Sequence, residues 1–403
     1  MRHAIVGGGV AGVTAAQAVR AADPAAEVHL FSEEPYPYYR RPLLWELIAG
    51  QIEQDAVFYR PAAWYAGQSI ALHLGARVTE LDPTARRLVL ADGSTWTYDR
   101  LLLATGSRSF VPPCAGSEQQ GVFSLRTLDD ALAIRAYIPR SSTAVVVGGG
   151  LLGLETARAL RTAGLDVTVL EFFPYLLPRQ LDPEGARVLQ ALLEAQGLHI
   201  ITAAETEAIL GGVCASSLRL ADGRTLPGDL VLFSAGVRSE AKLAKAVGLA
   251  VNRGIVVDGH LQTSAPDVFA AGDCAEFEGR VYGIIPPAIE QAKAAAANMV
   301  APASAVYAGT TPATTLKIAG AELTSLGESV AEGDGYIAIR HADLEAGRYR
   351  KLVLREGHVV GAILLNDRPR VRPISQLIEQ HVDVSAHAEH LLDDNFDLRS
   401  LLS

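Results

Sequence analysis

Two glycine-rich stretches have the residue spacing that binds the phosphates of a dinucleotide. The first cradle is Gly7-Gly8-Gly9-Val10-Ala11-Gly12 and the second cradle is Gly148-Gly149-Gly150-Leu151-Leu152-Gly153, each following a short apolar run. In a Gly-x-Gly-x-x-Gly pattern the first glycine permits a tight turn, the second lets the backbone approach a pyrophosphate, and the third lets a helix pack closely against a strand. The phosphates then lie at the positive end of the helix dipole. One such motif is weak evidence, but two indicate that the chain binds two dinucleotides.

Acidic residues follow each cradle at the distance expected for a ribose contact. Glu33 and Glu34 end a strand predicted over 27–32, and Glu171 ends a strand predicted over 166–170. About 20 residues after the glycines, a carboxylate in this position accepts hydrogen bonds from ribose hydroxyls and repels a 2′-phosphate. Glu171 therefore favours NADH over NADPH, although Arg179 nearby leaves that preference open. The alternative for these acids is a solvated position at the end of a strand.

The intervening segments predict the elements that position these residues. A helix is expected over 15–22, strands over 70–74, 77–81 and 87–90, and a buried strand over 101–103 that ends in Ala104, Thr105 and Gly106. Small residues at the end of a strand allow a ligand to approach the backbone. Arg40 and Arg41 lie in a rigid Tyr- and Pro-rich segment, where a guanidinium could neutralise a pyrophosphate. Both arginines could equally be surface charges.

The composition limits the classes of protein that remain. The 403 residues exceed one typical core, 49% of them are hydrophobic, and the formal charge of −10 argues against a nucleic-acid binder. Cys114, Cys214 and Cys274 have neither disulfide nor metal-ligand spacing, and the histidines show no ligand spacing either. Without a leader-like start or an apolar run of about 18 residues, we expect a cytoplasmic protein that does not enter a membrane.

The order of these motifs, continued by residues 268–274, resembles the FAD-dependent pyridine-nucleotide reductases of the glutathione-reductase-like superfamily over the whole chain. Residues 171–182 and 315–320 are most similar to the rubredoxin reductases and to the flavin modules of NAD(P)H nitrite reductases. The resemblance implies an α/β fold with two Rossmann-like domains, the NAD domain inserted into the FAD domain, and an α+β C-terminal domain. The implied segments are 1–110 and 237–312 for FAD, 111–236 for NAD, and 313–403 for the C-terminal domain.

The resemblance also assigns roles to single residues. Asp273 would hydrogen-bond the ribityl chain of FAD, and Lys317 would approach the flavin. We expect Glu155, Lys317 and Glu46 to tune the site electrostatically, with no side chain acting as a catalytic group and no metal. The further cofactor-binding positions that we expect are Val78, Gly236, Gly272 and Ile285. As alternatives, Asp273 caps a helix that starts at Cys274, and Lys317 is a salt-bridged surface lysine.

The function implied is hydride transfer from NADH to FAD, followed by electron transfer to a small carrier protein such as rubredoxin. The stretch that carries redox cysteines in disulfide reductases contains none here, and Cys274 is expected to be a buried filler. Glu46 replaces a lysine usual in oxygenase-coupled ferredoxin reductases. The alternatives are the flavin reductase component of a nitrite reductase or ferredoxin-reductase system, and a flavin-bound interaction protein that responds to NADH.

A late group of basic residues offers a candidate surface for an acidic partner. Its members are Arg348, Arg350, Lys351, Arg355, Arg368, Arg370 and Arg372. Residues 368, 370 and 372 would share one face if the segment were extended, and such a face would steer an acidic carrier. The alternative is an ordinary solvated surface.

Overall fold

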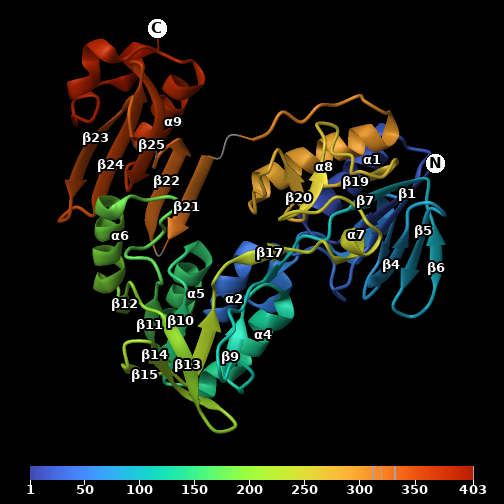
Figure 1. The fold of residues 1–403 in the computed structure, drawn as a ribbon, viewed down its shortest axis with the longest axis horizontal. Helices are drawn as coiled ribbons and strands as arrows, with labels where there is room; N and C mark the ends of the chain where they lie inside the picture. The colour runs from blue at the N-terminus through green and yellow to red at the C-terminus, as the bar shows by residue number, and fades with distance from the viewer. Residues whose placement is uncertain (311–312, 319, 331–332, 403) are drawn as a thin grey trace. The chain divides into compact units, whose positions relative to one another are not determined.

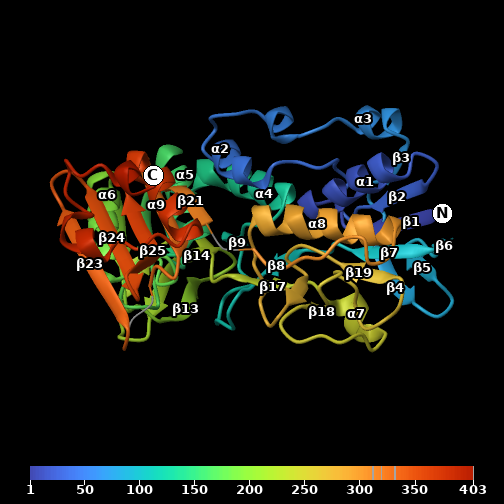
Figure 2. The same cartoon turned by 90° about the horizontal axis from the view of Figure 1, so that it is seen from above.

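The computed structural model describes residues 1–310, 313–318 (by their backbone), 320–330 and 333–402. Their contacts divide the chain into two compact units, whose elements are labelled in Figures 1 and 2. Unit 1 comprises Met1–Leu44, Glu53–Phe110 and Val237–Thr310. Unit 2 comprises Trp45–Ile52, Val111–Gly236 and Thr311–Ser403.

Unit 1 is organised around a five-stranded parallel sheet with the strand order β19-β7-β1-β2-β3. Its strands are β1 (Arg2–Val6), β2 (Glu27–Phe31), β3 (Ile70–His73), β7 (Arg100–Leu103) and β19 (Val268–Ala270). The central strands are almost fully buried apolar runs, as expected for parallel strands covered on both faces. The carboxyl ends of β1, β7 and β19 therefore meet at one edge, which is where the first cradle begins.

Two long helices of unit 1, α1 (Val10–Ala22) and α8 (Ile285–Val300), lie side by side (Figures 1 and 2). Half of the buried residues of each helix are alanines, so the two backbones can approach closely. The remaining helices are short: α3 (Ala62–Gly67), α7 (Lys242–Ala246) and the 3₁₀ turns Arg41–Leu43 and Gln54–Val57.

Small antiparallel and paired strands complete unit 1. The antiparallel meander is β4 (Val78–Asp82), β5 (Arg87–Leu90) and β6 (Thr95–Thr97). A two-stranded antiparallel ribbon joins β8 (Ser107–Ser109) to β17 (Val237–Ser239), and β18 (Ile255–Val257) pairs with β20 (Ala275–Phe277).

Unit 2 contains a second five-stranded parallel sheet with the order β12-β11-β10-β16-β9. Its strands are β9 (Val122–Ser124), β10 (Thr143–Val147), β11 (Asp166–Leu170), β12 (Leu198–Ile201) and β16 (Leu230–Phe233). The accompanying helices are α2 (Leu44–Ile48), α4 (Leu128–Tyr137), α5 (Leu151–Thr162), α6 (Pro183–Ala195) and the 3₁₀ turn Ile138–Arg140. A three-stranded meander consists of β13 (Thr206–Gly211), β14 (Ala215–Leu220) and β15 (Thr225–Pro227).

The other part of unit 2 is an antiparallel sheet with the order β21-β22-β25-β24-β23. Its strands are β21 (Ala313–Ile318), β22 (Ala321–Gly327), β23 (Tyr336–Asp343), β24 (Arg348–Arg355) and β25 (His358–Leu365). Helix α9 (Arg368–Glu379) and the 3₁₀ turns Ser385–His390 and Leu398–Leu401 complete this part. Leu352, Leu364, Ile374 and Leu391 belong to its hydrophobic core.

The α/β class with two Rossmann-like sheets and a C-terminal sheet domain is confirmed, whereas some local predictions are wrong. The residues after Cys274 form the strand β20, because Ala275–Phe277 pairs with β18 instead of starting a helix. Strand β22 was not predicted at all. Among the described residues, no helix is both long and apolar enough to cross a membrane.

The late basic group is not a single surface. Arg368, Arg370 and Arg372 lie in the first turns of α9 and not in an extended segment. Arg350, Lys351 and Arg370 are only 3%, 0% and 8% exposed. Arg350 donates from Nε to Asp367 Oδ2 at 2.5 Å, and Arg370 donates to the carbonyl of Leu391 at 2.8 Å. These arginines tie the C-terminal turns to the sheet and are unavailable to a partner.

A buried ion cluster joins α6 to the C-terminal sheet, next to which Figures 1 and 2 show this helix. Asp182 caps α6 by accepting from the N–H of Gly185 at 3.0 Å. Its other oxygen accepts from Tyr349 Oη at 2.7 Å and lies 3.2 Å from Nζ of the fully buried Lys351. Arg340 Nε is 3.3 Å away. Burial opposes ionisation of Asp182, but the Gly185 N–H, the Tyr349 hydroxyl and Lys351 outweigh it and lower its pKa.

We predict that Asp182→Ala destabilises unit 2 strongly, because it leaves the buried Lys351 ammonium without its carboxylate. Removing one partner of a buried ion pair lowers the free energy of unfolding by about 3–5 kcal/mol. Urea denaturation followed by circular dichroism will measure this free energy. Lys351→Met is the matched control and should cost less, since Asp182 keeps Arg340 and Tyr349. Equal losses for the two variants would contradict the prediction.

Candidate functional site: two dinucleotide cradles

The first cradle closes the turn between β1 and α1, and two of its glycines have no room for a side chain. Gly7 has φ +119°, and a Cβ there would lie 2.0 Å from the carbonyl oxygen of Ala104. A Cβ on Gly12 would lie 1.9 Å from the carbonyl oxygen of Gly7. At Gly9, by contrast, the nearest atom to an added Cβ is Arg41 Nη1 at 3.5 Å. The N-terminus of α1 has no side-chain cap, so its N–H groups, from Val10 onward, face this open position.

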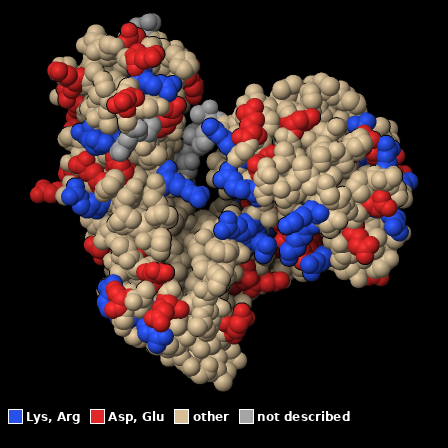
Figure 3. All heavy atoms as spheres, viewed as in Figure 1, with Lys and Arg blue, Asp and Glu red and all other residues tan. Residues whose placement is uncertain are grey.

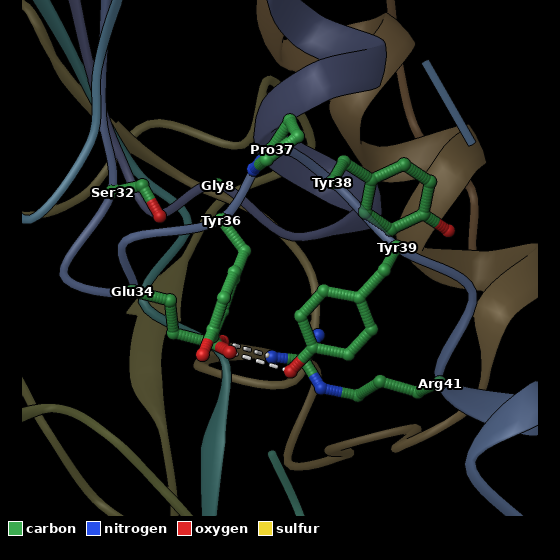
Figure 4. Close-up of a pocket in the computed structure, with 8 residues that line it drawn as sticks. All are labelled: Gly8, Ser32, Glu34, Tyr36, Pro37, Tyr38, Tyr39 and Arg41. Atoms are coloured by element: carbon green, nitrogen blue, oxygen red, sulfur yellow. Dashed lines mark hydrogen bonds and ion pairs between the residues drawn. The ribbon is translucent and has the colours of Figure 1, made fainter. Parts of the chain in front are cut away.

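A small pocket lies beside this cradle, at the end of β2. Its lining residues are Gly8, Ser32, Glu34, Tyr36, Pro37, Tyr38, Tyr39 and Arg41 (Figure 4). Glu34 accepts from Arg41 Nη2 at 2.9 Å and from Tyr39 Oη at 2.5 Å, and the figure shows the three side chains pointing toward one another. Arg41 therefore lies between Glu34, which its Nη2 contacts, and Gly9 of the first cradle, which its Nη1 approaches.

Glu33 and Glu34 differ sharply in their surroundings. The side chain of Glu33 is 68% exposed and lies 3.5 Å from Arg77, whereas that of Glu34 is 25% exposed and is held by two partners. The sequence placed both acids at the end of the strand but could not distinguish them. The structure brings Glu34, not Glu33, into the pocket next to Arg41.

The ends of β7 and β19 bring the other predicted positions to this edge of the sheet. Gly106 and Gly272 both have positive φ, at +71° and +85°. A Cβ on Gly272 would lie 3.0 Å from Cβ of Ala11, so residues 272–273 lie against the first cradle. The Gly272 N–H donates to the buried Gln291 of α8 at 2.9 Å.

Asp273 is held by two serines that the sequence did not single out. Ser107 Oγ donates to Asp273 Oδ2 at 2.8 Å, and Ser239 Oγ donates to the Asp273 carbonyl at 2.7 Å. Thr105 Oγ1 donates to the carbonyl of Glu240 at 2.5 Å. The β8–β17 ribbon thus fixes the residue expected to bind the ribityl chain. In the sequence, the contact could be suspected only from Ser107, a small residue with a hydroxyl group directly after Thr105-Gly106.

The other residues predicted for this site are less closely tied to the cradle. Val78 is a buried residue at the start of β4, and Ile285 is a 41% exposed residue in the first turn of α8. Cys274 is fully buried, its Sγ lies 3.3 Å from the Leu103 carbonyl, and burial raises its thiol pKa. These surroundings are those of a packing residue and not of a nucleophile.

The second cradle repeats the first between β10 and α5. Gly148 has φ +122°, and its Cβ would lie 2.3 Å from the carbonyl oxygen of Ser234. A Cβ on Gly153 would lie 1.9 Å from the carbonyl oxygen of Gly148. Gly150 has no atom within 4 Å of an added Cβ, and the same holds for Gly236. The open space above Gly150 and the uncapped N-terminus of α5, which begins with Leu151 and Leu152, fit a pyrophosphate.

Glu171 closes the second cradle through its carboxylate. Gly149 N–H donates to its Oε2 at 2.7 Å, and Phe173 N–H donates to its Oε1 at 2.8 Å. The residue is only 6% exposed. Each carboxylate oxygen can accept a second hydrogen bond, so the pair of backbone donors orients Glu171 without exhausting its capacity to bind a ribose.

Unit 2 contributes three further side chains, those of Glu155, Phe172 and Phe173. Glu155 on α5 is 3% exposed, and its Oε2 lies 3.2 Å from Arg158 Nη2. Phe172 is 65% exposed and meets Phe173 edge to face at 5.7 Å, directly after Glu171. Phe172 and Phe173 directly follow Glu171 in the sequence, but no role was predicted for them in the site. The side chain of Lys317 and the role predicted for it lie outside the described residues.

The structure therefore brings the predicted residues together in two groups. Unit 1 assembles the first cradle, Glu34, Arg41, residues 104–106 and residues 272–273. Unit 2 assembles the second cradle, Glu155 and Glu171. The spaces above Gly9 and Gly150 fit the pyrophosphate of a dinucleotide in each cradle.

We predict that two alanine substitutions in the second cradle affect different properties, one the binding of NADH and the other the thermal stability. Gly150→Ala adds a methyl group to open space at φ −77° and should leave the thermal midpoint unchanged. It should nevertheless weaken NADH binding about tenfold, or about 1.4 kcal/mol, because the methyl group occupies the space expected for the pyrophosphate. Gly153→Ala should lower the thermal midpoint through its contact with Gly148. Calorimetric titration with NADH and thermal unfolding will check both, and unimpaired NADH binding by Gly150→Ala would refute the assignment.

Comparison with known proteins agrees with this geometry. Residues 1–298 match the pyridine nucleotide-disulphide oxidoreductase family, and residues 312–382 match the rubredoxin NAD+ reductase C-terminal domain. The ferredoxin–NAD(+) reductase component of the biphenyl dioxygenase system of Paraburkholderia xenovorans is 35% identical over 406 residues, covering 99% of this chain and 98% of that protein.

Other similar proteins extend the comparison. The nitrite reductase [NAD(P)H] of Bacillus subtilis is 35% identical over 382 residues, which cover 94% of this chain but 47% of that protein. The chain thus spans about half the length of the nitrite reductases it matches. The crystal structure of a covalent putidaredoxin reductase–putidaredoxin complex is similar with a TM-score of 0.87 and 29% identity, covering 100% of this chain and 98% of that one. The resemblance inferred from the sequence is confirmed: the chain belongs to the pyridine nucleotide-disulphide oxidoreductase family, whose members bind FAD and a pyridine nucleotide.

Proposed function

We propose that the chain is an FAD-dependent NADH oxidoreductase that passes electrons to a small electron-carrier protein such as a rubredoxin or ferredoxin. The observation that carries this proposal is the presence of two complete cradles, each with its own oriented acid. A chain that holds two redox dinucleotides has an evident use in electron transfer between them. The chemistry that FAD supplies when bound is acceptance of a hydride and release of electrons one at a time.

The residues of unit 1 would bind and orient the flavin nucleotide. The N–H groups of α1 and the Arg41 guanidinium would neutralise the pyrophosphate, and Glu34 would accept from the adenosine ribose. Asp273, oriented by Ser107, would accept from the ribityl chain. The roles of Val78, residues 104–106, Gly272, Ile285 and Lys317 in this site belong to the same proposal.

The residues of unit 2 would bind the pyridine nucleotide and select NADH. Glu171 is a buried carboxyl group oriented by two backbone donors, so a 2′-phosphate at the same ribose would be repelled by it. Glu155 would act electrostatically and not as a proton donor or acceptor.

The electrons must leave the protein, because no cysteine pair receives them. Cys114, Cys214 and Cys274 are free thiols, and the thiol of Cys274 is fully buried. Relatives whose names include a ferredoxin–NAD(+) reductase support a small carrier as acceptor. The free thiols also support the cytoplasm as compartment, and we retain the four-segment domain division as part of the proposal.

A second candidate is the flavin reductase part of a nitrite-reducing system. The 35% identity to the B. subtilis nitrite reductase, which extends well beyond this chain, favours it. In that case a further protein or segment would reduce nitrite. The third candidate, an NADH-responsive interaction protein, would bind both nucleotides without rapid electron transfer to a carrier.

We predict that anaerobic NADH rapidly bleaches the flavin absorbance of the purified protein and that rubredoxin or ferredoxin restores it in stopped-flow experiments. Restoration only in the presence of a nitrite reductase partner would favour the second candidate. A long-lived NADH complex that no carrier reoxidises would overturn the proposal in favour of the interaction protein.

We predict that Glu171→Gln narrows the preference for NADH over NADPH by about tenfold in kcat/KM, or about 1.4 kcal/mol. The amide keeps the size of the side chain but removes the charge that repels a 2′-phosphate. Steady-state kinetics with both nucleotides will measure the ratio, and flavin content provides the control because Glu171 lies outside unit 1. If the ratio of kcat/KM for NADH to that for NADPH did not change, Glu171 would not determine the preference for NADH.

A further inference from the structure

We propose that the ribbon surface, defined as Arg108 and Arg238 of the β8–β17 ribbon with Lys242 and Lys245 of α7, is the docking surface for an acidic electron carrier. This inference rests on the proposed function, which supplies the need for a carrier. The ribbon surface takes the place of the basic group near the C-terminus as the candidate docking site, because Arg350, Lys351 and Arg370 of that group are buried.

The ribbon places positive charge on the face opposite the expected flavin nucleotide. Ser239 is paired with Ser107, and both side chains hold Asp273. The next pair along the ribbon is Arg238 with Arg108. Because successive residues of a strand point to opposite faces, the two arginines face away from Asp273. A carrier docked on them would lie on the opposite face of the ribbon from Asp273.

The pairing of Arg108 with Arg238 does not stabilise the ribbon, so the presence of two arginines at these positions calls for a reason other than folding. Like charges directly opposite each other in an antiparallel pair are destabilising. Arg238 stacks over the Phe110 ring at 4.6 Å, and Arg108 Nε lies 3.4 Å from Glu240 Oε2. These contacts orient the guanidinium groups, yet one carboxylate cannot neutralise two cations. Both side chains remain exposed, 59% in the case of Arg108.

Helix α7 begins three residues after β17 and carries two lysines, the first of which donates its backbone N–H to Glu240 at 3.2 Å. Lys242 and Lys245 are exposed, and neither ammonium forms an ion pair with any residue that the structure describes. Figure 3 shows Lys and Arg side chains gathered around the position that β17 occupies in Figure 1. The four cations of the ribbon surface carry more positive charge than Glu240, which pairs with Arg108, can balance.

The net charge of the chain explains why an acidic partner would need such a surface. At −10, the protein as a whole repels an acidic carrier. A local positive surface steers such a carrier to one place and raises the association rate at low ionic strength. A basic or neutral partner would gain nothing from these side chains.

The test is the double variant Arg238→Glu/Lys242→Glu, whose residues lie outside both cradles. Purified acidic rubredoxin and acidic [2Fe–2S] ferredoxin serve as probes. We expect kcat/KM for carrier reduction to fall about tenfold or more at low ionic strength, with a flatter salt dependence. The rate of flavin bleaching by NADH, measured by stopped flow without a carrier, should be unchanged.

The matched control is Arg60→Glu/Arg87→Glu, which changes the net charge equally at exposed positions of the same unit. It should retain most of the carrier activity. Carrier reduction by the ribbon variant at the rate of the unaltered protein, or an equal loss in the control, would overturn the docking surface while leaving the proposed function intact. Failure of the unaltered protein to reduce either carrier would instead overturn the proposed function, and the docking surface with it.

Discussion

Both candidate sites depend on a close approach of backbone to backbone at the point where a strand turns into a helix. The first and last glycines of each cradle lie so near to neighbouring carbonyl groups that a single added carbon would overlap them, at 2.0 and 1.9 Å in the first cradle and 2.3 and 1.9 Å in the second. This contact directs the N-terminus of the helix toward the end of the sheet, where its first N–H groups have no partner within the helix. The middle glycine then leaves a space that fits a phosphate.

The acids beside the cradles show that orientation matters as much as charge. The carboxylate of Glu171 is held by two backbone N–H groups, that of Glu34 by an arginine and a tyrosine, and that of Asp273 by Ser107, while Ser239 holds the Asp273 backbone carbonyl. In each case the neighbours restrict the carboxylate to a narrow range of positions before any ligand binds. Such preorganisation lowers the entropy lost on binding.

Positive charge in this chain serves two different purposes. Arg350, Lys351 and Arg370 are buried next to carboxylates or carbonyl groups, where they connect β24 and α9 to segments distant in sequence. The arginines of the β8–β17 ribbon are exposed and only partly compensated. Burial therefore separates the cations that stabilise the fold from those able to meet a partner.

The sequence by itself predicted the two glycine turns, the position of Glu171 beside the second of them and the α/β class, because each depends on spacing along a short stretch of chain. The tertiary structure alone decided that Glu34 and not Glu33 lies in the pocket, that Arg350, Lys351 and Arg370 are buried, and that residues after Cys274 form a strand. The contact between Ser107 and Asp273 joins residues 166 positions apart. Local periodicity carries no record of such pairings, which arise only when the order of strands in a sheet brings distant segments together.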